Sequence, residues 1–402
     1  MTIKHKLLTA YNSAWAISES VRYQIAGRKD GLPSGFVSPR KVFLLTSNGG
    51  GNSHGLSYPY RKFRRELATE LNLYFIEYMS DDLNEKLAVI RRNEADVFVV
   101  SVPVRDAKGE ILTKEAVVQF FDSIPTELRS KIIFFSPTDD PVSPYFDVLP
   151  KVRLFVTQFT FTDESNYDKS FAGGSAFADA IAEIYGIEIT PENEYHPELF
   201  NSFAPSDQRR KITTCWNFSY WRRILKMFQE QGGKCLSGGA RDIDINCRFN
   251  PYSGWNNKHR ESVVTEIESI DKKYVTALST GKIPVNEYFS EIERSKILVS
   301  PFGWGAICPK DYEAIMKGCL LVKPDIGHIN IFPNVLIPNV TYVPVKWDLS
   351  DLKEKLEYYL ENEDERNTIV KKAANVFEQS MRAEVFVGKV KEMFEAFDNS
   401  YV

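Results

Sequence analysis

The sequence predicts an α/β protein made of two Rossmann-like domains that face a cleft, with a helical extension at the N-terminus. The chain has 402 residues, which suits two domains of roughly 150 to 200 residues better than one core. Short apolar runs typical of strands alternate with longer helical patterns. One strand-helix-strand unit carries glycine, aromatic and charged residues where parallel sheets bind ligands.

We expect four segments: an N-terminal extension over 1–40, a first domain over 41–200, a second domain over 201–380, and a C-terminal helix over 381–402 that packs back on the first domain. The extension has apolar residues at helical spacing, including Leu7, Leu8 and Trp15. This pattern favours a helix docked on the protein itself, with contact to a membrane surface as the alternative.

The net charge, the cysteine pattern and the length of the apolar runs exclude several classes of function. A formal net charge of -4 and a pI near 5.9 argue against nucleic-acid binding. The five cysteines form no CxxC pair, so reduced thiols and no structural zinc are expected. No run approaches the roughly 18 to 20 apolar residues of a membrane helix, and no signal-peptide core is evident. We expect a cytoplasmic protein, with peripheral association at the inner face of a membrane as the alternative.

In the first domain, the predicted strand from Lys41 to Thr46 runs into the glycine-rich turn SNGGGNSHG. This turn matches neither the GxGxxG fingerprint nor a P-loop. It could bind a phosphate or a sugar, or it could be a plain connection. His54 is a candidate catalytic base, although a lone loop histidine can be incidental. The candidate acceptor-binding residues of the turn are Asn48, Gly50 and Gly51.

Three further apolar runs, Leu73 to Ile76, Val97 to Val100 and Lys131 to Ser136, alternate with helical patterns and predict an open, largely parallel sheet. The last of these strands ends in PTDDP. Asp139 or Asp140 could therefore be the general base that takes the proton from an acceptor hydroxyl. A solvated Asp-Pro turn is the alternative.

The second domain is expected to begin with the strand Ile212 to Trp216 and a helix from Tyr220 to Gln231. The basic residues Arg248, Lys258 and Arg260 follow, and such side chains can offset a diphosphate charge without a metal. The segment DID at 242–244 spells D-x-D, a metal-sugar-nucleotide signature, but its surroundings are of the metal-independent type. We predict neither a metal nor a cofactor.

The most informative stretch runs from Tyr288 to His328. It predicts a strand, a turn with the sequence PFGWG, a helix carrying Lys310 and Glu313, and a second strand. Phe302 and Trp304 offer flat surfaces to a base or a sugar, and glycines allow close backbone approach. The helix dipole and Lys310 favour an anion, and Glu313 can accept hydrogen bonds from a ribose diol. The alternative is a buried unit whose aromatic turn only packs.

The same residues, S-P-F-G-W-G followed by K-D-Y-E-A and G-C-L-L-V-K-P-D, resemble the donor-binding segment of GT-B glycosyltransferases, in particular the exostosin-like and group-1-like bacterial enzymes. The resemblance implies that Glu313 holds the ribose and that the last helix returns to the first domain. The chain departs from the pattern in two places. Gly305 stands where retaining enzymes commonly carry a second glutamate, and Ala306 stands where related turns often have an acid.

We therefore predict a metal-independent glycosyltransferase of the kind used in polysaccharide biosynthesis. It would move a sugar from a nucleotide-diphosphate sugar to a hydroxyl of a glycan or lipid-linked saccharide. Because acids are missing at Gly305 and Ala306, an inactive donor-binding or scaffold protein is the alternative. A nicotinamide-dependent enzyme would need a dinucleotide fingerprint, which is absent. The predicted donor-binding residues are Phe302, Gly303, Trp304, Gly305, Lys310, Glu313, Gly327, His328, Arg248, Lys258 and Arg260.

Overall fold

The computed structural model describes residues 38–47, 52–103, 106, 110–171, 175–189, 203–236, 238–249, 255–279, 281 and 283–400. The predicted N-terminal helix and the acceptor-binding candidates Asn48, Gly50 and Gly51 lie outside these ranges. Within the described ranges, no helix is both long and apolar enough to cross a membrane.

The first domain contains a six-stranded sheet in the order β2-β1-β3-β4-β5-β7, and every neighbouring pair is parallel. Successive side chains of a strand point to opposite faces, so Val42 and Leu44 belong to one core and Phe43 and Leu45 to another. Burial on both faces explains the nearly continuous apolar runs in the sequence. The strands are β1 (Arg40–Thr46), β2 (Leu73–Met79), β3 (Val97–Ser101), β4 (Ile132–Phe135), β5 (Leu154–Thr157) and β7 (Ile212–Thr214).

Strand β7 corrects the predicted start of the second domain. The sequence ITTCW was expected to open that domain, but Ile212 to Thr214 pair in parallel with Phe155 to Thr157 of β5. The polar linker before this strand suggested a boundary at residue 201. The chain instead adds one more strand to the first sheet before it crosses to the second domain, so that boundary was placed too early.

The second domain contains a five-stranded sheet in the order β13-β11-β10-β8-β9, again parallel throughout. In both domains the second strand lies on one side of the first, and the later strands lie on the other. This reversal makes a topological switch point between β1 and β3 and another between β8 and β10, where open α/β sheets bind ligands. The strands are β8 (Ile243–Arg248), β9 (Thr276–Ser279), β10 (Ser295–Val299), β11 (Leu320–Pro324) and β13 (Val343–Val345).

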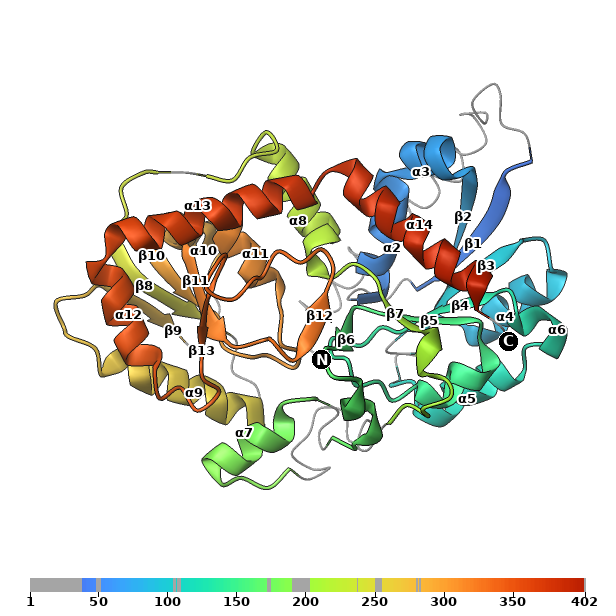
Figure 1. The fold of residues 1–402 in the computed structure, drawn as a ribbon, viewed down its shortest axis with the longest axis horizontal. Helices are drawn as coiled ribbons and strands as arrows, with labels where there is room; N and C mark the ends of the chain where they lie inside the picture. Colours follow the sequence, from blue (N-terminus) through green and yellow to red (C-terminus); the bar gives the residue numbers. More distant parts are fainter. Residues whose placement is uncertain are drawn as a thin grey trace.

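Helices cover the faces of both sheets (Figure 1). Capping side chains mark where two of these helices begin. The Asp82 side chain accepts a hydrogen bond from Asn84 N, and the Thr113 hydroxyl accepts one from Ala116 N at the start of the next helix. The helices of the first half of the chain are α2 (Asn52–Lys62), α3 (Arg64–Leu71), α4 (Leu83–Arg92), α5 (Lys114–Asp122), α6 (Thr126–Arg129) and α7 (Ala178–Tyr185), the last of which packs against the second-domain helix α9 (Trp255–Glu268). The later ones are α8 (Arg222–Glu230), α9 (Trp255–Glu268), α10 (Val285–Glu293), α11 (Pro309–Met316), α12 (Leu352–Glu361), α13 (Glu363–Ser380) and α14 (Ala383–Asn399).

Two of the attachments between the domains come from segments far apart in sequence. Helix α14 lies across the first domain (Figure 1), where Phe386 is fully buried and packs on Trp216 with ring centroids 4.7 Å apart. Strand β6 (Phe159–Phe161) of the first domain pairs in antiparallel fashion with β12 (Ile329–Ile331) of the second. One hydrophobic core accordingly contains residues of both domains.

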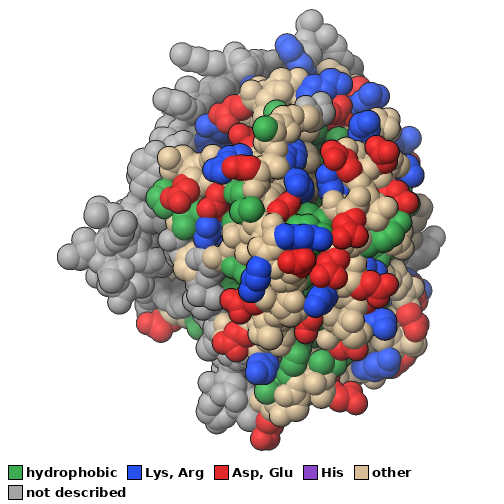
Figure 2. Space-filling view, turned by 90° about the vertical axis from the view of Figure 1, so that its left-hand side faces the viewer, with side chains coloured by type: hydrophobic (Ala, Val, Ile, Leu, Met, Phe, Trp, Pro, Cys, Tyr) green, Lys and Arg blue, Asp and Glu red, His purple; other side chains and the backbone are tan. Residues whose placement is uncertain are grey.

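The outer end of the second domain carries mixed charge. Figure 2 shows lysine and arginine interspersed with aspartate and glutamate, and hydrophobic side chains in small separate groups. A nucleic acid would need a continuous basic surface, which this face does not offer.

Candidate functional site

The PFGWG bend lies at the switch point of the second sheet and touches the first domain. It follows β10 directly, and a Cβ atom added to Gly305 would lie 2.2 Å from the backbone oxygen of Asp139, which follows β4. The Ser175 hydroxyl donates a hydrogen bond to the Trp304 carbonyl at 3.4 Å. The carboxyl edges of the two sheets therefore meet at the bend, so the expected cleft is closed at this point.

Phe302 packs between the domains instead of presenting an open face. Its side chain is fully buried, and its ring centroid lies 4.2 Å from that of Phe177 in the first domain and 5.5 Å from that of His259 on α9. For Phe302, the packing alternative describes this arrangement better than a surface for a base or a sugar. Gly303 and Trp304 are only half-buried. Trp304 is thus the aromatic residue of the bend that keeps an exposed part.

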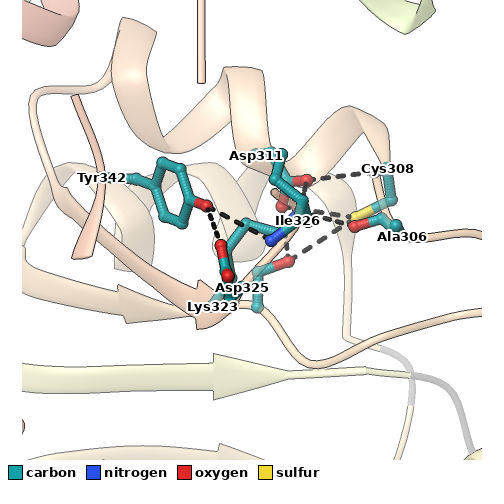
Figure 3. Close-up of polar contacts among 8 residues, drawn as sticks. Ala306, Cys308, Asp311, Lys323, Asp325, Ile326 and Tyr342 are labelled. Carbon is teal, nitrogen blue, oxygen red and sulfur yellow. Dashed lines mark hydrogen bonds and ion pairs between the residues drawn. The ribbon is translucent and has the colours of Figure 1, made fainter. Parts of the chain in front are cut away.

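A buried charged network lies beneath the bend, and sequence reasoning missed it (Figure 3). Lys323 of β11 forms an ion pair with Asp311 of α11 and donates to the Ala306 carbonyl at 2.7 Å. Asp311 also accepts hydrogen bonds from the Ser300 hydroxyl at 2.6 Å and from Cys308 N at 3.1 Å. A lysine inside the otherwise apolar run LLVKP was the available signal.

This network changes the expected role of the α11 N-terminus. The N–H of Cys308 is donated to the helix's own Asp311, and Pro309 has no N–H to offer. The first turn therefore contributes fewer free donors to an anion than the sequence pattern suggested. Cationic side chains have to supply most of the positive charge at this site.

Three of the four predicted basic residues converge on the ends of β8 and β10. The Lys310 amine donates to the Arg248 carbonyl, and the Arg248 guanidinium pairs with Glu291 through an Nη2 to Oε1 contact of 2.6 Å. The guanidinium of Arg260, which is buried, donates from Nε to the Phe302 carbonyl at 2.9 Å. The structure thus brings Lys310, Arg248 and Arg260 together at the switch point.

Lys258 and Glu313, the other two charged residues predicted to bind the nucleotide sugar, have different surroundings. Lys258 is exposed on α9. Glu313 is almost fully buried: Oε2 accepts a hydrogen bond from the Tyr288 hydroxyl at 2.7 Å, and Oε1 pairs with Arg223 at 2.7 Å. Burial raises the pKa of Glu313, and Arg223 opposes that shift. A ribose diol would have to displace one of these partners, and Arg223, with 54% of its side chain exposed, is the freer one.

The catalytic candidates of the first domain separate into different roles. Asp140 is buried and accepts hydrogen bonds from Val142 N at 3.0 Å and from the Ser175 hydroxyl at 3.1 Å; burial raises its pKa to about 7. It therefore orients the residue that contacts Trp304. Asp139 is half-buried beside Gly305. His54 lies on α2, but its side chain is outside the described residues. The backbone oxygen and Cβ of Asp139 lie against the bend, while its carboxylate accepts a hydrogen bond from Gln158 Nε2 at 3.2 Å.

The turn after β11 also contacts the first domain. Thr162 donates from its backbone N to the His328 carbonyl at 3.1 Å and from its hydroxyl to the Gly327 carbonyl at 3.1 Å. The His328 ring meets the Trp347 ring edge-on, with centroids 5.2 Å apart. Both predicted residues of this turn therefore lie at the domain interface, held there mainly through their backbone carbonyls.

His328 and His259 are unusual in their burial. Neither ring nitrogen of His328, nor Nε2 of His259, has a hydrogen-bond partner among the described residues. His259 Nδ1 lies 3.4 Å from the Tyr185 hydroxyl, and its ring stacks on Phe302. Burial lowers the pKa of His259 to about 3 and that of His328 to about 4. Both imidazoles are therefore neutral in the folded protein near pH 7.

A pH dependence follows from these two histidines. Between the folded pKa values and the ordinary value near 6.5, the unfolded chain binds more protons than the folded one, so each histidine lowers stability as the pH falls. Relative to a His259→Phe/His328→Phe variant, the free energy of unfolding of the natural chain should fall by about 1 kcal/mol per histidine per pH unit, because the unfolded histidines are only half protonated at pH 6.5. Urea unfolding at pH 6.5, 5.5 and 4.5 measures this difference, in which the opposite contribution of Asp140 cancels. A pH-independent difference would contradict the prediction.

The D-x-D segment lies at the opposite edge of the second sheet. Asp242 accepts from Arg294 Nε at 2.7 Å, and Asp244, at the start of β8, pairs with Lys296 at 2.7 Å. Both carboxylates therefore serve ion pairs at the amino end of the strand, away from the bend. Among the described residues, no group of three or more His, Cys, Asp or Glu side chains is arranged to hold a metal ion.

Comparisons with known proteins concern the fold. Neither a protein-family model nor a curated protein sequence matches the chain. Anabaena HepE, solved with UDP and glucose, is 12% identical, with 89% of this chain and 100% of that chain covered and a TM-score of 0.45. A glycosyltransferase from Rickettsia africae is 12% identical, with 90% of this chain and 100% of that chain covered and a TM-score of 0.45. S. aureus MnaA, solved with UDP, is 9% identical, with 90% of this chain and 99% of that chain covered and a TM-score of 0.44. The strand order of the two sheets confirms the predicted pair of Rossmann-like domains.

Proposed function

We propose that this protein is a glycosyltransferase that moves a sugar from a nucleotide-diphosphate sugar to an acceptor hydroxyl. One observation carries the proposal. The PFGWG bend, with Lys310, Arg248 and Arg260 around it, lies at the switch point of the second sheet and against the carboxyl edge of the first. An activated sugar held by the cations of one domain would thus lie next to the polar strand ends of the other.

The arrangement suits the chemistry of group transfer. As the bond between the sugar and the diphosphate breaks, negative charge builds on the leaving group, and fixed cations lower the barrier by stabilising it. The Lys310 amine donates one of its three N–H groups to the Arg248 carbonyl, so the other two can donate to a phosphate. The acceptor hydroxyl forms the new bond to the sugar, and its proton passes to Asp139 in this proposal.

The acceptor and the metal requirement belong to the proposal as well. We infer a hydroxyl of a glycan or lipid-linked saccharide as acceptor, and cationic side chains in place of a metal ion. The exposed part of Trp304 offers a surface on which a sugar or a base can stack.

An inactive donor-binding protein is the second candidate, and Gly305 is the observation that favours it. No side chain fits at this position in the structure, because a Cβ atom would collide with the backbone of Asp139. An acidic side chain is therefore absent at position 305 because the contact between the domains leaves no room for one. The backbone of Asp139 occupies the space beside Gly305, so in an active enzyme the carboxylate would come from the side chain of this first-domain residue.

A screen of nucleotide sugars by thermal unfolding tests the proposal. The correct donor at about 100 times its Kd should stabilise the folded protein by about 2.7 kcal/mol and raise its Tm accordingly. Measuring donor hydrolysis and transfer on the stabilising donor separates the two candidates. Binding with neither reaction favours the inactive protein, and no stabilisation by any nucleotide sugar contradicts both.

Glu313→Ala is the matching site variant. We expect it to abolish the Tm rise given by the correct nucleotide, because it removes the carboxylate assigned to the ribose. Arg223→Ala is the comparison, since it frees Glu313 from its exposed partner without removing the carboxylate. An unchanged Tm rise in Glu313→Ala would show that the ribose contact is elsewhere.

A further inference from the structure

The Asp311–Lys323 pair is buried far more deeply than the other ion pairs of the second domain. The exposed fractions of the two side chains are 0% and 1%, whereas the Arg294–Asp242 pair of the same domain has 51% and 61%. Taking two charges out of water is costly, and an apolar pair of similar size often stabilises a fold equally well. The contacts of this pair therefore matter more than its own attraction.

Those contacts hold the chain on both sides of the bend. Before it, Asp311 accepts from the Ser300 hydroxyl at 2.6 Å. After it, Lys323 donates to the Ala306 carbonyl at 2.7 Å, and Asp311 accepts from N of Cys308, the N-cap of α11, at 3.1 Å. Three polar groups within residues 300–308 are thus hydrogen-bonded to one charged pair.

A second set of contacts fixes the neighbouring turn in the same way (Figure 3). The Tyr342 hydroxyl donates to Asp325 at 3.3 Å and accepts from Ile326 N at 3.4 Å. Trp347 donates from Nε1 to the Asp325 carbonyl at 2.8 Å. Since Asp325 follows β11, which carries Lys323, both loops that reach the domain interface are tied to one rigid strand.

We propose that Asp311 and Lys323 are positioning residues for the nucleotide-diphosphate site. They hold the bend and the first turn of α11, which carries Lys310, in a fixed geometry before the leaving diphosphate arrives. This inference rests on the proposed function. Its structural part, that the pair immobilises residues 300–308, is independent of any ligand. A misplacement of about 1 Å in such a site can lower the rate about 100-fold.

Replacing both partners tests the proposal without leaving one charge buried alone. The Asp311→Leu/Lys323→Met variant keeps the volume and removes the contacts. The control is Asp242→Asn/Arg294→Gln, which removes the exposed pair at the opposite edge of the same sheet. Asp311→Asn/Lys323→Met is a second variant that removes both charges, keeps an acceptor for Cys308 N, and covers the case in which the first variant does not fold.

Hydrogen exchange by mass spectrometry and nucleotide binding are the two measurements. We expect Asp311→Leu/Lys323→Met to remain folded with a lowered Tm, because Cys308 N–H and the Ala306 carbonyl lose their buried partners, while amides of residues 300–308 exchange at least tenfold faster. The Kd for UDP, GDP or another nucleoside diphosphate that stabilises the natural chain should rise about 10- to 100-fold. The control should change neither quantity.

The outcomes separate the two proposals. Unchanged exchange over residues 300–308 overturns the positioning role, whatever the ligand results. Faster exchange with an unchanged Kd also overturns it, because the fixed geometry would then not serve binding. If the natural chain binds no nucleoside diphosphate, the proposed function fails, and with it the role in diphosphate binding; the exchange rates still decide whether the pair immobilises the bend.

Discussion

Gly305→Ala is expected to lower the kcat/KM of the proposed sugar transfer by about 100-fold and to cost about 1 to 3 kcal/mol of stability. The added methyl group would lie 2.2 Å from the Asp139 oxygen, so the bend and the first domain must move apart there. A displacement of about 1 Å between reacting groups is enough for a loss of this size. Steady-state transfer assays with the donor found by the thermal screen measure the effect.

Gly388→Ala provides the matched control. Gly388 lies in α14, and a Cβ atom there meets nothing within 4 Å. Alanine is a better helix former than glycine, so this variant should gain about 0.5 to 1 kcal/mol of stability and keep full activity. Equal activities of Gly305→Ala and Gly388→Ala would show that the contact between the bend and Asp139 is not needed for transfer.

Phe386→Ala should cost about 3 to 5 kcal/mol of folding free energy. The Phe386 ring is fully buried, and its centroid lies 4.7 Å from that of Trp216, 5.1 Å from that of Phe63 and 5.4 Å from that of Tyr220. Truncation would leave a cavity between α14 and the first domain that these rings cannot fill. Urea unfolding at constant pH measures the change.

Lys391→Ala on the same helix is the control for this stability change. Lys391 is exposed, and its ion pair among the described residues is with Glu395 one turn further on, at 3.8 Å. Such a surface pair contributes little, so the variant should stay within about 0.5 kcal/mol of the natural chain. A similar small loss in Phe386→Ala would mean that α14 is not integral to the folded first domain.

The fold class could be predicted because both sheets are buried on both faces. Runs such as KVFLLT, VFVVS and KILVS are apolar without alternation, which is typical of parallel strands, and helical patterns separate them. The place of β7 could not be predicted. Periodicity identifies a strand, but pairing with β5 depends on contacts between residues more than fifty positions apart.

The candidate site was predictable where glycine, aromatic and basic residues cluster in sequence. The bend and Lys310 were found in this way, and the structure places both at the switch point. The contacts of Glu313 with Arg223 and Tyr288, and of Phe302 with Phe177, could not be predicted. The partner residues come from other elements, so sequence spacing does not indicate that Glu313 and Phe302 already contact protein side chains.

The β6–β12 ladder and helix α14 together limit how the halves of this molecule can move. A single linker would let one domain swing freely, but here the ladder, α14, the packing of α7 on α9 and the contact between Gly305 and Asp139 all join the halves. Any separation of the two domains would have to break several of these contacts together, so relative motion of the halves is expected to be small.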